Sequence, residues 1–233
     1  MCAKPRFLFN KYNLTNALTK LLYRVTPYTW EFHANITSIN GKVIILDQTC
    51  FFPRGGGQVG DIGELSGNRV IETLIVESEV QHILEESPTF SIGQAVIGRV
   101  DWNRRYRIMR LHSASHLVYY AMQEVFGLKC KPSSSGLLDD MKDRSDYFFE
   151  VPLDREKLSE VESRVNQIIE RSLPITHKPE NADSERILWK IEPYNAMACG
   201  GTHVRNTGEI GRIQLRRGSK PGKGKERIEL ILM

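Results

Sequence analysis

Residues 102–126 read WNRRYRIMRLHSASHLVYYAMQEVF, and this stretch decides the fold of the second half of the chain. Apolar residues recur in it at spacings of three and four, which predicts one long helix with a single buried stripe. Gly127 follows directly, and glycine commonly ends a helix. The predicted stripe consists of Ile108, Leu111, Ser115, Val118, Met122 and Val125.

This predicted helix carries His112 and His116 at the edge of its apolar stripe. Residues four apart share a helix face, with Cβ atoms about 5–6 Å apart. A second pair with the same spacing, Cys199 and His203, stands in the glycine-rich segment CGGTH. Imidazole and thiolate are preferred zinc ligands, and four of them complete a tetrahedral set. The two pairs therefore predict one Zn²⁺ site, built from two segments remote in sequence.

The spacing of the two pairs excludes two common zinc proteins. His116 and Cys199 are separated by 82 residues, whereas the pairs of a zinc finger lie about 12–20 residues apart. Ser113 follows the first histidine, where a zinc peptidase carries the glutamate that acts as general base. A purely structural zinc ion stays open, because four protein ligands normally leave no position for water.

Composition describes an ordinary folded chain rather than a membrane or secreted one. The 233 residues are 40% hydrophobic and 26% charged, enough for one large or two small domains. No apolar run approaches the roughly 18 residues of a membrane span, and the N-terminus lacks the apolar core of a signal peptide. The four widely spaced cysteines do not suggest a disulfide framework. We therefore expect a reduced cytoplasmic protein without a membrane partner.

Basic residues flank both ligand pairs, although the net charge is only +4. Such clusters are typical of proteins that bind a polyanion, with nucleic acid the obvious candidate. Either cluster alone could equally be a solvated surface. The first consists of Arg99, Arg104, Arg105, Arg107 and Arg110, and the second of Arg216, Arg217, Lys220, Lys223, Lys225 and Arg227.

The N-terminal half has the pattern of short β-strands. Asn40-Gly41 between two apolar runs predicts a hairpin, and Gly67-Asn68 predicts a second turn. Residues 94–100 form a last predicted strand. Several short strands separated by turn residues are typical of a small β-barrel. Before them, Leu14, Ala17, Leu18 and Leu21 could form a short amphipathic helix.

The pattern after the long helix alternates between strand and helix. Residues 146–151 look like a strand, and Asp154 is a suitable N-cap for a helix that ends near Ser172. Two closing strands are predicted over residues 210–217 and 227–232. We predict an α+β fold: an N-terminal extension (1–21), a small β-barrel-like domain (22–100) and an α/β two-layer domain that carries the zinc site (101–233).

Two further segments could contact a ligand. Three consecutive glycines, Gly55, Gly56 and Gly57, precede Gln58, and such a run costs chain entropy unless bare backbone is needed there. A ligand could approach this backbone closely, or the run could be a tight loop between strands; it is not a P-loop, because no Gly-Lys-Ser/Thr follows. Ser133 lies in PSSSG, which could offer hydroxyls to a small polar group or form a surface turn.

Several sequence blocks, in the same order, resemble the editing domain of alanyl-tRNA synthetase. The chain is most similar to the free-standing alanyl-tRNA editing proteins, the AlaX family, over about residues 21–233. The glycine-rich block resembles the medium-length type of this family. The blocks are LDQTCFFP (46–53), GGGQ (55–58), DW with RR and MRLH (101–112), CGGTH (199–203) and TGEIG (207–211).

This resemblance implies a zinc-dependent hydrolase that acts in trans on mischarged tRNA(Ala). Such proteins cleave the ester that joins serine, and in some members glycine, to the 3′-terminal adenosine. Carried over residue by residue, the zinc ligands are His112, His116, Cys199 and His203. The acceptor end of tRNA(Ala) would be the partner, ATP is not implied because no aminoacylation domain fits in this length, and we expect a monomer or weak dimer.

The expected roles of individual residues follow from this chemistry. Zinc would position the substrate amino group or a water beside the ester carbonyl, and backbone amides around Gly200 to Thr202, with Gly201 and Thr202 as the candidate catalytic residues, would stabilise the oxyanion. A hydroxyl of Ser113, Ser133 or Thr202 would bind the seryl hydroxyl and so reject alanine. Ser113 and Ser115 stand where the family often has threonine. The predicted substrate or tRNA contacts are Gly55, Gly56, Gly57, Gln58, Ser133, Arg105, Arg216, Lys223 and Lys225.

Two other functions remain open at this point. The zinc could be structural in a module that binds RNA without hydrolysing it. The chain could also be a zinc esterase of small molecules.

Overall fold

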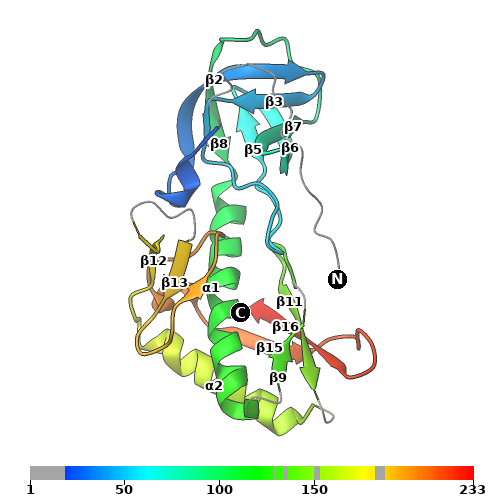
Figure 1. Ribbon diagram of the computed structural model, residues 1–233, viewed down its shortest axis with the longest axis vertical. Coiled ribbons are helices and arrows are strands. Elements are labelled where there is room, and N and C mark those ends of the chain that lie inside the picture. Colours follow the sequence, from blue (N-terminus) through cyan, green and yellow to red (C-terminus); the bar gives the residue numbers. More distant parts are fainter. Residues whose placement is uncertain (1–18, 128–129, 134–135, 150–152, 182–186) are drawn as a thin grey trace, which may run out of the picture.

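The computed structural model describes residues 19–127, 130–133, 136–149, 153–181 and 187–233. Within these ranges the chain is a mixed α/β structure of several sheets with helices α1 (Trp102–Phe126) and α2 (Arg155–Glu170) (Figure 1). No described helix is both long and apolar enough to cross a membrane. The short helix predicted through Leu14, Ala17 and Leu18 lies outside the described residues, and Leu21 ends the two-residue strand β1 (Lys20–Leu21), which pairs with β4 (Gln48–Thr49).

Six strands of the N-terminal half close into one ring, in the order β2-β3-β7-β6-β5-β8. The ring forms the upper part of Figure 1. The predicted hairpin joins β2 and β3, but its two turn residues are Gly41 and Lys42, because Asn40 still pairs with Val43; Gly41 has a φ of 57°, which favours glycine. The strands are β2 (Glu31–Asn40), β3 (Val43–Leu46), β5 (Gly63–Leu65), β6 (Asn68–Val76), β7 (Glu79–Leu84) and β8 (Ala95–Val100).

Helix α1 leaves the ring directly after β8 and runs through the second half of the molecule (Figure 1). Its predicted bounds are confirmed, because the Asp101 side chain caps its first turn by accepting from Arg104 N and Gly127 follows its last residue. The helix is buried on more than the single predicted stripe, since it contacts both α2 and strands of the adjacent sheet. The additional buried apolar side chains are Met109, Ala114, Leu117 and Ala121, and the polar side chains of Arg105 and Ser113 are buried as well.

Beside α1 lies a sheet in the order β10-β11-β16-β15, with β9 also paired to β11. Asp154 caps α2 as predicted, accepting from Glu156 N. The predicted strand over 210–217 is shorter than expected, because residues 207–210 form the 3-10 helix η3 (Thr207–Ile210). The strands are β9 (Cys130–Pro132), β10 (Leu137–Leu138), β11 (Asp143–Phe149), β15 (Ile213–Arg217) and β16 (Lys225–Leu232).

A third sheet, which the sequence pattern did not predict, consists of β12 (Thr176–Pro179), β13 (Ile187–Lys190) and β14 (Met197–Ala198). Strand β14 ends immediately before Cys199, so this sheet positions the second ligand pair. Two hydrophobic clusters fall on either side of residue 100, one inside the ring and one around α1 and α2. The division of the chain into domains there stays a prediction.

Arg105 joins α1 to the ring from the interior. Its guanidinium pairs with the carboxylate of Asp61, and both side chains are only 1% exposed. It also donates to the backbone oxygens of Pro27 (2.9 Å) and Cys50 (2.6 Å). The prediction that Arg105 binds tRNA is therefore wrong, because a phosphate cannot reach a buried guanidinium whose donors are already used.

Candidate metal centre

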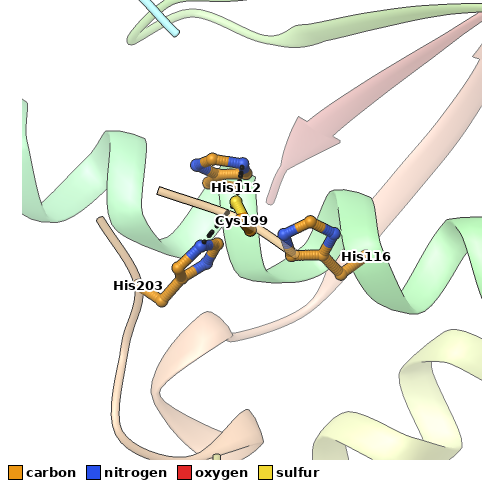
Figure 2. A group of neighbouring side chains, drawn as sticks. All are labelled: His112, His116, Cys199 and His203. Carbon is orange, nitrogen blue, oxygen red and sulfur yellow. Dashed lines mark hydrogen bonds between the residues drawn. The ribbon is translucent and has the colours of Figure 1, made fainter. Parts of the chain in front are cut away.

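The four predicted ligand residues come together although they derive from two remote segments (Figure 2). One ligand atom of each lies within 4.8 Å of all the others. Cys199 Sγ is 3.4 Å from His112 Nε2 and 3.2 Å from His203 Nε2. Ligand atoms around a tetrahedral zinc ion are roughly 3.3–3.8 Å apart, given bonds of about 2.0–2.3 Å. The two distances from Cys199 Sγ are close to this spacing, and all four donors are of the types that zinc prefers, so the set fits a zinc-sized cation after small side-chain adjustments.

His116 supplies a second observation in favour of a metal. Its Nε2 is buried and has no hydrogen-bond partner among the described residues. Its ring lies 5.0 Å from that of His112 and 4.9 Å from that of His203, measured between centroids. Because an unpaired buried polar atom costs free energy, such an atom requires an explanation, and a metal ion supplies one.

The electrostatics of the cluster favour neutral imidazoles. Burial lowers the pKa of His112 to about 3 and holds the pKa values of His116 and His203 well below the usual range, with a further lowering by neighbouring histidines. Burial raises the pKa of the Cys199 thiol to about 11, against a hydrogen bond from Gly201 N that lowers it. Neutral imidazole is the form that binds metal, and a bound cation would favour the thiolate.

Gln58 holds His112 in place. Its Oε1 lies 2.8 Å from His112 Nδ1 and accepts from Thr202 N at 3.2 Å, while its Nε2 donates to Thr202 Oγ1 at 3.1 Å. An Nδ1–H donated to Gln58 leaves Nε2 of His112 as the free ligand atom, a common arrangement around metal-binding histidines. Gln58 and Thr202 are 1% and 0% exposed, so neither side chain can contact a substrate. The predictions that these two side chains bind substrate are therefore wrong.

Ser113 holds the second pair in the same way. Its Oγ accepts from Val204 N at 3.1 Å and lies 3.4 Å from His203 Nδ1. The side chain is fully buried. The prediction that Ser113 binds substrate is wrong, because its helical position turns the hydroxyl toward residues 203–204 and away from solvent.

Gly201 lies against the His112 ring. A Cβ added there would be 2.2 Å from His112 Cε1, so only glycine fits. Its N–H is directed to Cys199, and the N–H of Thr202 is directed to Gln58. Two of the amides that were predicted to stabilise an oxyanion, those of Gly201 and Thr202, are therefore used within the site, and the role of the Gly200 amide stays a prediction.

The glycine run connects the ring to the second half of the molecule. Gly56 and Gly57 have φ values of 59° and 90°, which only glycine adopts readily. Gly57 O accepts from Leu138 N at 2.9 Å, and Gln58 bridges to the same strand. This arrangement favours the tight-loop interpretation, and contact of Gly55, Gly56 or Gly57 with substrate stays a prediction.

Two residues beside the centre had no signal in the sequence. His177 Nε2 lies 2.9 Å from the backbone oxygen of Cys199, and its ring centroid is 4.7 Å from that of His203. The ring of Trp189 lies 4.7 Å from that of His116. No regular spacing links either residue to the ligand pairs, and only the pairing of β12, β13 and β14 brings them there.

A small cavity of about 270 Å³ opens beside His116. His116 is both a member of the donor cluster and part of the cavity wall, so a molecule in the cavity would lie next to a bound metal. Ser133, predicted to contact substrate, lines it. The other polar or aromatic lining residues include Ser115, Tyr119, Ser145 and Asp146.

The two basic clusters differ in availability. In the first, Arg104 pairs with Asp140, and Arg110 donates to the backbone oxygen of Ile210, so these side chains are used within the fold. In the second, Arg217 and Lys220 pair with Glu226, and Arg227 pairs with Asp146. Arg216 and Lys223 of this cluster are exposed and form no ion pair among the described residues. Lys225 lies 4.8 Å from the ring centroid of Phe148, itself 46% exposed. The cluster formed by Arg216, Lys223 and Lys225 can therefore meet a polyanion.

Comparisons with known proteins show which class of protein carries these features. The family model of the second additional domain of threonyl and alanyl tRNA synthetases matches residues 189–229. The model of class II (A) tRNA synthetases matches residues 4–104. The chain is thus a relative of class II aminoacyl-tRNA synthetases.

Individual relatives narrow this class. Alanine–tRNA ligases of Ignicoccus hospitalis and Sulfurisphaera tokodaii are 32% and 33% identical to this chain. The alignments are 236 and 244 positions long, gaps included, and each covers 91% of this chain. The chain spans about a quarter of these ligases, 26% of each. The alanyl-tRNA editing protein AlaX-M of Pyrococcus horikoshii is 31% identical over 216 residues, covering 92% of this chain and 98% of that protein. The chain therefore belongs to the alanyl-tRNA editing protein family, AlaX, which confirms the resemblance read from its sequence blocks.

Proposed function

We propose that the chain is an editing hydrolase that removes serine from mischarged tRNA(Ala), with glycine as the second candidate amino acid. The observation that carries this proposal is the double position of His116, which belongs to the donor cluster and also lines the small cavity. A cavity of about 270 Å³ suits a small aminoacyl group better than a larger ligand. The family membership supplies the ester and the tRNA.

The donor set His112, His116, Cys199 and His203 would hold a zinc ion. In such a site zinc supplies Lewis-acid and electrostatic assistance to ester hydrolysis. Gln58 and Ser113 keep His112 and His203 oriented, so they act on the reaction through the ligands.

The tRNA acceptor end would lie across the second basic cluster. Arg216, Lys223 and Lys225 are available for phosphate contacts, which give affinity without reading sequence. Ser133, which lines the cavity, remains the predicted contact of the aminoacyl group.

Deacylation of Ser-tRNA(Ala) tests the proposal. Wild-type chain loaded with zinc should release serine, and His116→Ala should lose bound zinc and hydrolysis together. His33→Ala is the matched control, because His33 is exposed on β2 within the ring. A His116→Ala variant that is free of metal yet as active as wild type would exclude a zinc-centred reaction.

The same assay separates two other functions. A module with structural zinc would bind tRNA(Ala) without deacylating the seryl ester. A small-molecule esterase would hydrolyse a free seryl ester as fast as the tRNA ester. Hydrolysis of the tRNA ester at least tenfold faster than the free ester would favour the editing function.

A further inference from the structure

Two serine hydroxyls in the cavity wall share one buried acceptor. Ser115 Oγ donates to Asp143 Oδ2 at 3.1 Å, and Ser145 Oγ donates to the same oxygen at 2.8 Å. Asp143 is only 6% exposed and lies behind the wall, whereas both serines line the cavity. Ser115 comes from α1, and Asp143 and Ser145 come from one face of β11, so the three meet where the helix packs on the sheet.

This sharing determines the polarity of the cavity wall. A hydroxyl has one hydrogen to donate and two lone pairs that accept. Because both serines donate their hydrogens to Asp143, their oxygens can offer only lone pairs to the cavity. The wall therefore accepts hydrogen bonds there, and it favours a ligand group that donates one.

The charge of Asp143 supports this polarity. Burial raises the pKa of Asp143 to about 6, although hydrogen bonds from Ser145 and Ser115 lower it. The carboxyl is therefore ionised above neutral pH and can only accept. Ser115 is also the residue next to His116, which places the acceptor pair beside the donor cluster.

We propose that Ser115 and Ser145 are the residues that select serine, by accepting a hydrogen bond from the hydroxyl of the substrate's seryl group. Asp143 is a positioning residue: it accepts both hydroxyl hydrogens and so keeps the oxygen lone pairs of the two serines available to the cavity. An alanyl or glycyl group has no side-chain donor and leaves these oxygens unpaired, which is the strongest form of discrimination available to a small pocket. This inference rests on the proposed editing function. It assigns the selecting role to residues other than Ser113 and Thr202, whose side chains are buried elsewhere.

The test compares Ser-, Gly- and Ala-tRNA(Ala) as substrates of zinc-loaded full-length variants at pH 7.5. Ser145→Ala and Ser115→Ala should each lower kcat/KM for the seryl ester roughly tenfold, the effect of one hydrogen bond, while kcat/KM for the glycyl ester changes less than about twofold. Asp143→Ala should act similarly, because it removes the shared acceptor and frees both hydroxyls to rotate. Ser159→Ala, at an exposed position on α2, is the matched control and should change neither.

The outcomes separate this inference from the proposed function. A variant that loses activity equally toward seryl and glycyl esters, with zinc still bound, overturns the selecting role, because the cavity then holds a part common to both substrates. Unchanged activity toward the seryl ester in Ser115→Ala and Ser145→Ala also overturns it. Wild-type chain that hydrolyses none of the three esters refutes the editing function itself, and this inference with it.

Discussion

Gln58 Oε1 lies 2.8 Å from His112 Nδ1, although the two residues are 54 positions apart in sequence. The contact links the glycine-rich loop of the N-terminal half to helix α1, which carries His112 and His116. It sets which nitrogen of His112 faces the other ligands, so the loop contributes to the metal centre without touching the metal. The sequence suggested that this loop contacts substrate, whereas its Gln58 side chain orients a donor histidine.

Gln58→Ala should lower zinc affinity about 10–100-fold, the usual effect of removing a partner of a metal-binding histidine. The lost acceptor frees the His112 ring to rotate. Competition with a chromogenic chelator measures the affinity, and Gln167→Ala, exposed on α2, is the control. Equal affinities for Gln58→Ala and wild type would show that Gln58 does not orient His112.

Gly201→Ala and Gly200→Ala form a matched pair. The added Cβ at 201 would be 2.2 Å from His112 Cε1, whereas at 200 it would meet nothing within 4 Å. We expect Gly201→Ala to lower zinc affinity at least tenfold and to destabilise the fold by about 1–3 kcal/mol, the cost of overpacking. Gly200→Ala should change little. Chelator competition and thermal unfolding compare them, and equal effects in both variants would contradict the close approach of Gly201 to His112.

Arg105→Met should destabilise the chain by about 3–5 kcal/mol, because it leaves the Asp61 carboxylate buried without its partner. The double variant Arg105→Met/Asp61→Leu should be less destabilised than Arg105→Met alone. Arg54→Met breaks the more exposed pair with Glu72 and should cost at most about 1 kcal/mol. Urea unfolding measures the stability of all three variants. Similar losses of unfolding free energy for Arg105→Met and Arg54→Met would contradict a stabilising role for the buried Arg105–Asp61 pair.

Arg216→Gln and Lys223→Gln should each weaken binding of uncharged tRNA(Ala). Each should also reduce the slope of log affinity against log salt concentration by about one unit, the contribution of one phosphate contact. Seryl-ester hydrolysis at saturating tRNA should stay near the wild-type rate, because these residues lie outside the metal centre. Arg164→Gln, on α2 and paired with Glu160, is the control. If the affinities of both variants depend on salt concentration with the same slope as that of wild type, Arg216 and Lys223 do not contact tRNA phosphates.

His82 should make the fold sensitive to mild acid. Burial in the ring lowers its pKa to about 4, against a backbone hydrogen bond with Ile44 O that raises it. The unfolded chain, with a histidine pKa of about 6.5, then binds a proton that the folded chain does not. Stability is therefore complete above pH 6.5 and falls as the pH drops toward 4, by roughly 2 kcal/mol at pH 5.

The variant His82→Gln isolates this effect. Its free energy of unfolding should depend less on pH between 7.5 and 5 than that of wild type, with zinc at the same saturating concentration in both. His33→Gln, at an exposed position, should keep the wild-type dependence. Parallel pH profiles for His82→Gln and wild type would show that His82 is not held neutral.

Helix α1 and the four ligands could be predicted because their signals are local. The period of the apolar residues, the N-cap Asp101 and the glycine at 127 all lie within or next to the helix. The two ligand pairs each have a spacing of four, and the chemistry of imidazole and thiolate indicates zinc at any position. The hairpin between β2 and β3 is equally local, since its turn needs a positive φ at Gly41.

The roles of Arg105, Gln58 and Ser113 could not be predicted, because each depends on which remote segment packs against it. Arg105 belongs by sequence to a basic cluster, yet its partners are Asp61, Cys50 and Pro27, between 44 and 78 residues away. His177 and Trp189 reach the centre only through the third sheet.

The sequence by itself determined helices α1 and α2, the hairpin between β2 and β3, the four candidate metal donors and the family, since these depend on residue type, spacing and order. The tertiary structure alone decided which polar side chains line the cavity and which orient the donor histidines. Burial and hydrogen-bond direction are properties of packing between segments, and they turned Gln58 and Ser113 inward while leaving Ser115 and Ser145 in the cavity wall.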